Sequence, residues 1–492
     1  MCRAWRQVFT SRPSLWSDFD CEDTDKTHVY LERSKSSPID LRLRRVEWVE
    51  GLSPLDPFLQ VVPRATTRLR SLDILGTPEN LRYIAARLSH PAPLLTSLTV
   101  GVDWKCSPED GPTIPITLFD RDLSSLRELR LNCIRTELPW RNMANLTSFT
   151  LRYALHGNFP ISHLLDFFEA TPRLREVHLH SATPTSGAQN GRLVSLPCLK
   201  RMVILGGGPT SLLLNHLLIP AGAKLTTQIS VALFAPAPCS NIFGSNIFDG
   251  HLPRSLNNLR NLSSPTEIHL HIGGFHPRVQ FSGPNGQVNM IPQTPRNAIT
   301  TRMLESLLHL VGLDTSKVER LRIYDGNLVD NGGHCTFNNA LISLESLRTL
   351  TISRCTNLSA SIPGLSCNRI GRNLEELVLD PRVHREKFDI QTVIDIAATR
   401  ASAGSKLKSI RIVSGDKSVQ ARALELWKYV EHVECSPGVA AECDESDSSD
   451  ESDGSDEGDG DDEGDGSDEG DGTDEGDGGD GDDESDGSDE EY

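Results

Sequence analysis

The 492-residue chain lacks any long apolar run. Its richest apolar stretches, 212–219 and 231–235, are far shorter than the roughly 18 residues that a membrane span needs. The N-terminal residues 1–6 do not begin a continuous apolar segment of the kind found in secretory signals. We therefore expect a protein that has no membrane partner and is intracellular, in the cytoplasm or the nucleus.

The chain also lacks paired cysteines. No two of its 11 cysteines lie within four residues of each other, and their number is odd. This spacing excludes zinc knuckles, redox pairs of the Cys-x-x-Cys type and the disulfide framework of a small secreted protein. The sequence thus predicts reduced thiols, with no structural metal and no cofactor.

A catalytic constellation is missing as well. The run Gly206-Gly207-Gly208-Pro209 stands where a phosphate loop could lie, but no Lys-[Ser/Thr] pair follows it. The pairs His178/His180 and His269/His271 each point to one side of a strand, yet no cysteine or carboxylate lies at convincing ligand spacing. We therefore expect no catalytic residues and no metal ligands, in a protein that is not an enzyme.

Lysine and arginine are absent from the last 51 residues. Residues 442–492 contain 28 Asp+Glu, which leaves 40 acids against 49 bases in residues 1–441, a net charge of +9. No apolar side chain occurs between residues 444 and 491, so burial cannot offset the entropy of ordering this segment. We expect a disordered acidic tail over 436–492, with possible phosphorylation sites that precede Asp-Glu at Ser455, Ser467, Thr473 and Ser488.

Residues 1–441 contain a repeat. Each copy follows the order apolar, two mostly polar residues, apolar, variable, apolar, as in Leu126-Arg-Glu-Leu129-Arg-Leu131. Copies start 20 to 33 residues apart where the spacing is regular, which overlaps the period of leucine-rich repeats. The copies lie at 69–74, 95–100, 126–131, 146–151, 174–179, 199–204, 318–323, 347–352, 374–379 and 407–412, with a weaker one at 267–270.

Alternating apolar and polar residues predict a short strand in each copy, with one buried face. Helical patterns separate the strands, at 79–89, 161–170, 211–218, 301–311, 390–399 and 419–430. The predicted fold class is α/β: a leucine-rich-repeat-like solenoid over 63–435, with parallel strands on its concave wall, helices outside and an irregular insertion at about 206–296. A doubly wound α/β enzyme is the competing interpretation, but its strands would be apolar on both faces.

The register of the repeat also predicts which side chains face the solvent on the concave wall. They flank the last two apolar positions of each copy. Arg320, Arg322 and Tyr324 combine residue types that are enriched at binding hot spots. The predicted partner-binding residues are Arg130, Arg152, His178, His180, Arg320, Arg322, Tyr324 and Arg411.

The N-terminus carries a further motif. It reads Cys2-Arg-Ala-Trp5-Arg6, then Pro13-Ser-Leu15-Trp16, and later Arg33-Ser34 followed by Pro38-Ile-Asp-Leu41. This pattern, together with the phrase at 164–177, resembles the F-box-like proteins with leucine-rich repeats that are abundant in fungi. The resemblance implies a partial F-box-like segment at 1–20 and a linker at 21–62. The two further helices of an F-box would either precede Met1 or have been lost, and in the second case the remaining helix would pack on the first repeats.

That resemblance also implies partners. A complete F-box would bind a Skp-type adaptor and, through it, a cullin, and the adaptor-contacting residues here would be Cys2, Trp5, Arg6, Val8, Pro13, Leu15 and Trp16. The expected function is a protein-protein interaction module that selects a protein substrate for an SCF-type ubiquitin ligase. The alternative is a ligase-independent repeat scaffold or an acidic-tailed chaperone of basic proteins. Specific nucleic-acid binding is not expected.

Overall fold

A computed structural model describes residues 2–437 with interruptions, and it divides the chain into the units Met1–Val439 and Ala440–Tyr492. The residues outside the description are 1, 22–23, 47–61, 64, 103–112, 115–117, 137–141, 153–159, 182–190, 207–209, 231–251, 254–255, 263, 272–277, 285, 294–312, 325–334, 356–357, 359–361, 368–369, 382–387 and 438–492. The fold described below is that of the first unit.

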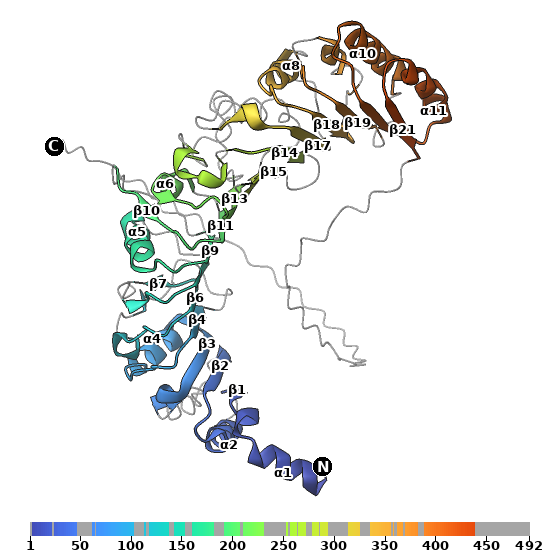
Figure 1. The fold of residues 1–492 in the computed structure, drawn as a ribbon. Coiled ribbons are helices and arrows are strands. Elements are labelled where there is room, and N and C mark those ends of the chain that lie inside the picture. Colours follow the sequence, from blue (N-terminus) through green and yellow to red (C-terminus); the bar gives the residue numbers. More distant parts are fainter. Residues whose placement is uncertain are drawn as a thin grey trace, which may run out of the picture. The chain divides into compact units, whose positions relative to one another are not determined.

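The first unit is built on one 17-stranded sheet (Figure 1). Its strands are β1 Asp18–Asp20, β2 Ile39–Val46, β3 Leu69–Gly76, β4 Ser97–Val102, β6 Glu128–Asn132, β8 Ser148–Arg152, β9 Glu176–His180, β11 Arg201–Gly206, β13 Lys224–Ser230, β14 Glu267–His271, β15 Arg278–Gly283, β16 Gly286–Gln293, β17 Arg320–Tyr324, β18 Thr349–Ser353, β19 Glu376–Asp380, β20 Ser409–Val413 and β21 His432–Ser436. Two smaller sheets pair β5 Thr113–Ile114 with β7 Arg135–Thr136, and β10 Val194–Ser195 with β12 Leu217–Leu218.

Helices connect many of the strands. The α-helices are α1 Arg3–Ser11, α2 Thr24–Ser34, α4 Pro78–Arg87, α5 Ile161–Ala170, α6 Thr210–Leu214, α8 Cys335–Ile342, α10 Ile390–Ser402 and α11 Lys417–Ala423. The 3-10 helices are η1 Pro13–Trp16, η2 Thr66–Arg68, η4 Leu118–Arg121, η7 Leu256–Asn258, η8 Arg260–Leu262, η9 Thr315–Lys317, η10 Ile362–Ser366 and η11 Leu424–Lys428. Helices α4, α5 and α10 lie on one side of the sheet, and in the described part of the chain that they flank the strands form the opposite side (Figure 1).

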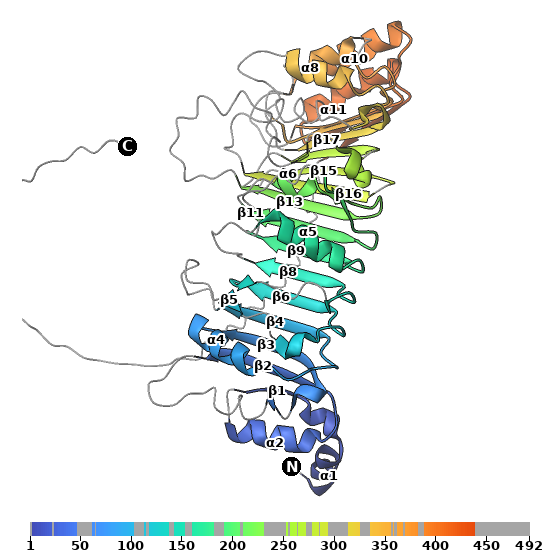
Figure 2. The same cartoon turned by 90° about the vertical axis from the view of Figure 1, so that its left-hand side faces the viewer.

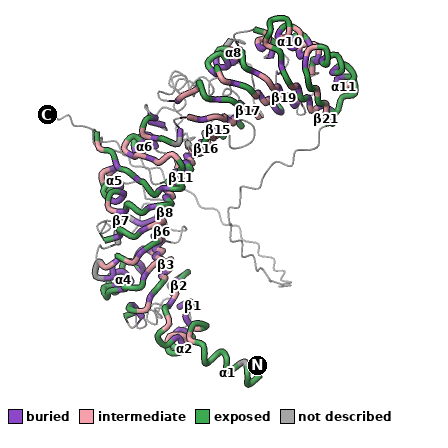
Figure 3. Tube along the Cα trace, viewed as in Figure 1, coloured by how far each residue is buried: buried purple, intermediate pink, exposed green. Residues whose placement is uncertain are grey.

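The strands of the sheet run almost entirely parallel. From β1 to β13 each strand pairs with the next one along the wall, and from β17 to β21 the same rule holds (Figure 2). Each predicted copy of the repeat forms a strand whose last two apolar residues are buried, as Leu129 and Leu131 are in β6. These apolar side chains form one continuous core, and buried residues recur in strand after strand along the sheet (Figure 3). The long parallel sheet, the repeated register and the alternating burial are those of a leucine-rich-repeat solenoid.

Local sequence accounts for several element ends. At α4, which covers most of the helix predicted at 79–89, the Thr77 side chain accepts a hydrogen bond from the backbone N–H of Asn80, and Pro78 takes the first helical position. After β6, β9 and β18 the chain turns through a residue with positive φ, namely Cys133, Ser181 and Arg354. The N–H of each of the three then donates to a carbonyl on the next rung, so the turn links neighbouring repeats.

The irregular insertion expected at about 206–296 supplies four strands of the sheet, β13 to β16, and the last three stand in a rearranged order. Strand β16 pairs in parallel with β13, β15 pairs antiparallel with both β16 and β14, and β14 pairs in parallel with β17. The weak copy at 267–270 is β14 itself. Strand β16 has no full copy of the repeat, although its alternate residues Val288 and Met290 are buried.

Two local expectations need correction. Residues 21–62, predicted as a linker, include α2 and β2, and β2 is a strand of the sheet because Ile39, Leu41 and Leu43 alternate with Asp40 and Arg42 and are buried. The helix predicted at 211–218 ends as α6 at residue 214, and the chain continues into the short strand β12. The helix predicted at 301–311 lies outside the described residues.

Candidate partner-binding surface

We call the outward-pointing side chains of the 17 strands the strand face. They alternate with the core residues, so that β17 shows its Arg320, Arg322 and Tyr324 while Leu321 and Ile323 are buried. All eight residues predicted to bind a partner occupy outward positions of this kind: Arg130, Arg152, His178, His180, Arg320, Arg322, Tyr324 and Arg411.

The structure brings four of these residues together on β6, β8 and β9. The register places Arg152 beside His180, and the adjoining Thr150 beside His178. The two histidine rings stack with centroids 6.3 Å apart and planes inclined by 7°. Burial lowers the pKa of His178, and the positive charge of Arg201 lowers it further, so this imidazole is neutral near pH 7. A neutral stacked ring offers hydrogen bonds and an apolar face to a partner.

A second group lies where β14 and β17 pair, and its centre is Glu267. Its Oε1 is 3.0 Å from His269 Nε2 and 3.1 Å from a guanidinium nitrogen of Arg322. The hydroxyl of Ser282 on β15 donates to its Oε2 at 3.3 Å. Burial raises the pKa of Glu267, but the contact with His269 and the charges of Arg322 and Arg320 outweigh it and lower that pKa. The carboxylate is therefore ionised, and it orients Arg322 on the strand face.

Sequence reasoning missed Glu267. It is the outward residue at the start of the weak repeat copy, a position that earlier copies fill with Ser97, Glu128 and Ser148. The sequence alone did not show that β14 pairs with β17, because this pairing depends on the strand order of the insertion. The pairing places Glu267 beside Arg320, His269 beside Arg322 and His271 beside Tyr324. The rings of His271 and Tyr324 lie 6.2 Å apart.

Arg411 stands apart from both groups. Two strands, β18 and β19, separate β20 from β17. The guanidinium of Arg411 lies 3.2 Å from a carboxylate oxygen of Glu434 on β21, and both side chains are about half exposed. An exposed pair of this kind contributes little to stability, so Arg411 remains accessible to a partner.

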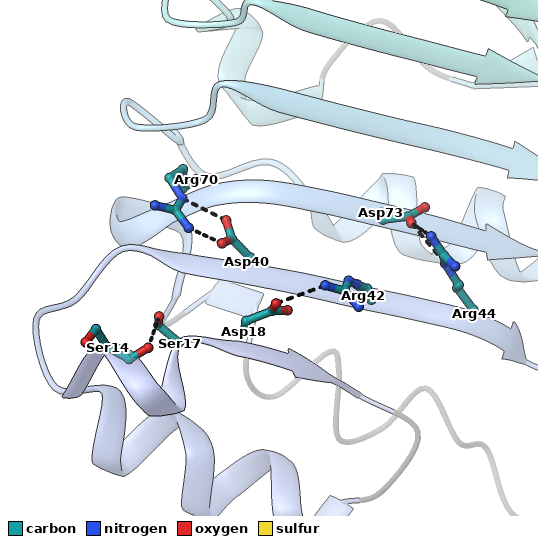
Figure 4. A network of polar contacts seen from close by, with 8 residues as sticks. All are labelled: Ser14, Ser17, Asp18, Asp40, Arg42, Arg44, Arg70 and Asp73. Atoms are coloured by element: carbon teal, nitrogen blue, oxygen red, sulfur yellow. Dashed lines mark hydrogen bonds and ion pairs between the residues drawn. The ribbon is translucent and has the colours of Figure 1, made fainter. Parts of the chain in front are cut away.

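The N-terminal end of the strand face carries a network that the sequence did not reveal (Figure 4). Its three ion pairs join neighbouring strands: Arg42 with Asp18, Arg70 with Asp40, and Arg44 with Asp73. Each base faces an acid, so this part of the surface is nearly neutral. Its alternating Asp-Leu-Arg-Leu-Arg sequence at 40–44 was a strand signal inside the expected linker.

The predicted adaptor-contacting residues divide into an exposed and a packed set. Cys2, Arg6, Val8 and Leu15 are exposed and Pro13 is partly so, while the side chain of Trp5 lies outside the described residues.

Trp16 is packed instead. Its indole N–H donates to the Phe9 carbonyl at 2.7 Å, its ring meets Tyr30 edge-on at 5.2 Å, and the Arg33 guanidinium lies 4.3 Å above it. This stacking fixes η1 on α2.

Several other predicted features fall outside the described residues. These are Gly207-Gly208-Pro209 and the possible phosphorylation sites Ser455, Ser467, Thr473 and Ser488. Among the described residues, no group of three or more His, Cys, Asp or Glu side chains could hold a metal ion. Within the same residues, no helix has the length and apolar character required to cross a membrane.

Comparisons with known proteins add little. No family model matches the chain, and no curated protein does. A solved structure of the leucine-rich repeat-containing protein LegL7 from Legionella pneumophila is similar over 71% of this chain and 86% of that chain, with 11% identity and a TM-score of 0.22. A TM-score this low carries no weight, so the assignment to the leucine-rich-repeat fold depends on the strand register described above.

Proposed function

We propose that the chain is a non-enzymatic protein-interaction module whose strand face recognises a segment of a partner protein. The observation that carries this proposal is the row Arg320–Arg322–Tyr324 on β17, which stands beside Glu267, His269 and His271 on β14. Arginine and tyrosine supply much of the energy at protein interfaces. Glu267 restrains Arg322, so less side-chain entropy is lost when a partner binds.

Quantitative affinity capture tests this role. The double variant Arg320→Glu/Tyr324→Ala should lose its specific partners by about tenfold or more, a change of roughly 1.4 kcal/mol in binding. The control is Arg82→Glu, an exposed residue of α4 on the helical side of the sheet. Partners retained equally by both variants would refute a role for the strand face.

We further propose that the partner is a substrate of an SCF-type ubiquitin ligase. Support comes from the resemblance of the N-terminal motif to F-box-like proteins and from three exposed apolar side chains on α1 and η1. Val8, Phe9 and Leu15 are 41%, 38% and 47% exposed. Exposed apolar side chains that lie close together mark an interaction surface. In this role the chain recruits, and the chemistry of ubiquitin transfer belongs to the other subunits.

Co-purification with a Skp-type adaptor and a cullin tests the ligase role separately. We expect capture by a chain extended at its N-terminus with the two further F-box helices, and loss of capture when the extended chain carries Val8→Glu/Leu15→Glu, whose exposed positions should leave the fold intact. Absence of adaptor binding by the extended chain would overturn this role while leaving partner recognition by the strand face untouched.

The second candidate is a ligase-independent scaffold. The packing of Trp16 against Tyr30 and Arg33 favours it, because these contacts join the F-box-like segment to the repeat domain. A scaffold with an acidic tail would also act as a chaperone of basic proteins. Binding of a strongly basic test protein that disappears when residues 442–492 are deleted, without adaptor binding, would support this candidate.

A further inference from the structure

A row of residues lies at or just before the start of the strands from β3 to β11, directly after the first apolar residue of the repeat. We call it the rim row. From the second member onward each N–H donates at 2.8 Å to the carbonyl of the previous member, so the row is a continuous ladder of backbone hydrogen bonds. Its members are Arg70, Thr96, Arg127, Thr147, Arg175 and Lys200.

The rim row accumulates positive charge without compensation. Arg70 is paired with Asp40, but Arg127, Arg175 and Lys200 are exposed and their side chains have no hydrogen bond or ion pair within the described part of the chain. The two threonines keep the ladder regular, since Thr147 Oγ1 donates to the Arg127 carbonyl at 3.0 Å. The bases are therefore held at fixed intervals on a rigid edge.

The second half of the sheet shows that this charge is not required by the fold. There the same ladder runs through Thr266, Glu319, Arg348, Glu375 and Lys408, in which the charges alternate in sign. Lys408 and Glu375 form an ion pair at 3.0 Å. Both halves form the same backbone ladder, so the ladder does not require an excess of bases at these positions.

A groove of about 740 Å³ runs along the rim row. Arg127 and Arg175 line it together with Arg173, whose guanidinium donates to Asn145 Oδ1 at 2.7 Å. Leu94 and Cys198 add an apolar surface near its ends. None of the described residues that line the groove is acidic or aromatic.

The length of the groove fits a short peptide. It extends from the loop before β4 to the loop before β11, which is four strand-to-strand steps. At roughly 4.8 Å a step this is about 19 Å, the length of about six residues of extended peptide. Arg127 and Arg175 lie two steps apart, a spacing of roughly 10 Å, and their long side chains can reach carboxylates two or four residues apart, which share one face of such a peptide.

We propose that this groove binds an extended acidic segment of a partner protein, about six residues long, whose carboxylates pair with Arg127, Arg173 and Arg175. Guanidinium groups form paired hydrogen bonds with carboxylates, and Leu94 and Cys198 contact the apolar parts of the segment. Single-stranded nucleic acid is the lesser fit, because its binding sites stack bases on aromatic side chains and the described lining has none. The groove is distinct from the strand face, so it constitutes a second interaction surface.

Fluorescence anisotropy of the full chain tests this inference. The probes are a labelled peptide of alternating Glu and Leu, about six residues long, and a matched peptide with Gln in place of Glu, at roughly 50 mM salt. We expect binding of the acidic peptide alone, and a loss of affinity of about tenfold or more for Arg127→Glu/Arg175→Glu.

The matched control is Arg348→Glu/Arg372→Glu, which makes the same charge change at exposed positions of the second half and should keep wild-type affinity. Thermal melting of both variants verifies their folding. Lack of binding by the acidic peptide, equal losses in the two variants, or equal binding of the Gln peptide would overturn the proposal. So would an RNA of about six nucleotides that displaces the peptide from the wild-type chain and depends more strongly on Arg127 and Arg175.

Discussion

Glu267 shows how single side chains organise the strand face. Its side chain is 18% exposed and its carboxylate contacts both His269 and Arg322, so one acid restrains two potential binding residues. Both neighbours still reach the surface, because the side chains of His269 and Arg322 are 24% and 38% exposed. A restrained but accessible arginine is a better anchor for a partner than a freely moving one.

The histidines of the strand face should make stability depend on pH. Burial lowers the pKa values of His178 and His269 below the ordinary value of about 6.5; Arg201 adds to this at His178 and Arg322 at His269, where Glu267 opposes it. As the pH falls through about 6.5, the unfolded chain therefore takes up protons before the folded chain does, and the free energy of unfolding decreases.

Urea denaturation between about pH 7.5 and about pH 5.5 measures this effect. The wild-type chain should lose stability towards the acidic end, and His178→Gln/His269→Gln should lose less of it. His90→Gln, in an exposed loop, controls for the removal of a histidine. Identical pH profiles for the wild-type chain and the double variant would contradict the prediction.

Arg400 illustrates what residue patterns cannot reveal. It belongs to α10 and is fully buried, and its guanidinium donates to the carbonyls of Leu365, Ile370 and Gly371 at 2.8 to 3.2 Å. A helical arginine is ordinarily assigned to the solvent side, since burying its charge is costly without partners. The partners here are backbone carbonyls more than 25 residues away, and no feature of the local sequence indicates them.

At the scale of elements, the sequence predicted those strands that carry the whole repeat signal. In β6, β9 and β17 two buried apolar positions alternate with three outward ones, which leaves a single choice of buried face. The insertion was less predictable because β16 pairs not only with β15, the strand just before it, but also with β13, which lies far earlier in the sequence. The outward positions of the eight predicted binding residues followed from the repeat alone, whereas the groups they form required the strand order.

The ends of the strands provide a prediction about glycine. Gly206, at the end of β11, has φ of +139°, and a Cβ placed there would lie 2.7 Å from the Cα of Ser181 on the preceding rung. Gly404, after α10, has φ of +76° and open space around it. Alanine at 404 should therefore cost about 1 kcal/mol from backbone strain alone, and alanine at 206 about 3 kcal/mol from strain and overlap.

Chemical denaturation of Gly206→Ala and Gly404→Ala measures the loss of stability in each variant. Because both substitutions add one methyl group at a positive φ, Gly404→Ala is the control for backbone strain. Equal destabilisation by the two would show that the contact with Ser181 relaxes at no cost, contrary to our expectation.

At the scale of the whole molecule, the net charge of −19 combines parts of opposite sign. Residues 1–441 have a net charge of +9, and the structure shows where part of that excess lies, in Arg127, Arg175 and Lys200 of the rim row. The acidic residues of 442–492 should reduce the attraction of the whole chain for polyanions.

Deleting residues 442–492 tests this balance. The shortened chain should bind heparin more tightly at low salt than the full chain does, and the gain should diminish as salt is added. The control is a shortened chain that also carries Arg127→Glu/Arg175→Glu, in which the gain should be smaller. Unchanged heparin affinity after the deletion would rule out a screening role for the acidic segment.

The rearranged order of the insertion has a consequence for biosynthesis. On a ribosome, β14 emerges before β16, yet the edge of β13 is completed by β16 and not by β14. The nascent chain must therefore leave that edge unpaired while β14 and β15 are made. Until residue 293 has emerged, β14 competes for the same edge in the parallel direction that every earlier strand has used. During translation the strands can therefore be added to the sheet in chain order up to β13, and the strand that pairs next to β13 is added only after residue 293 has emerged.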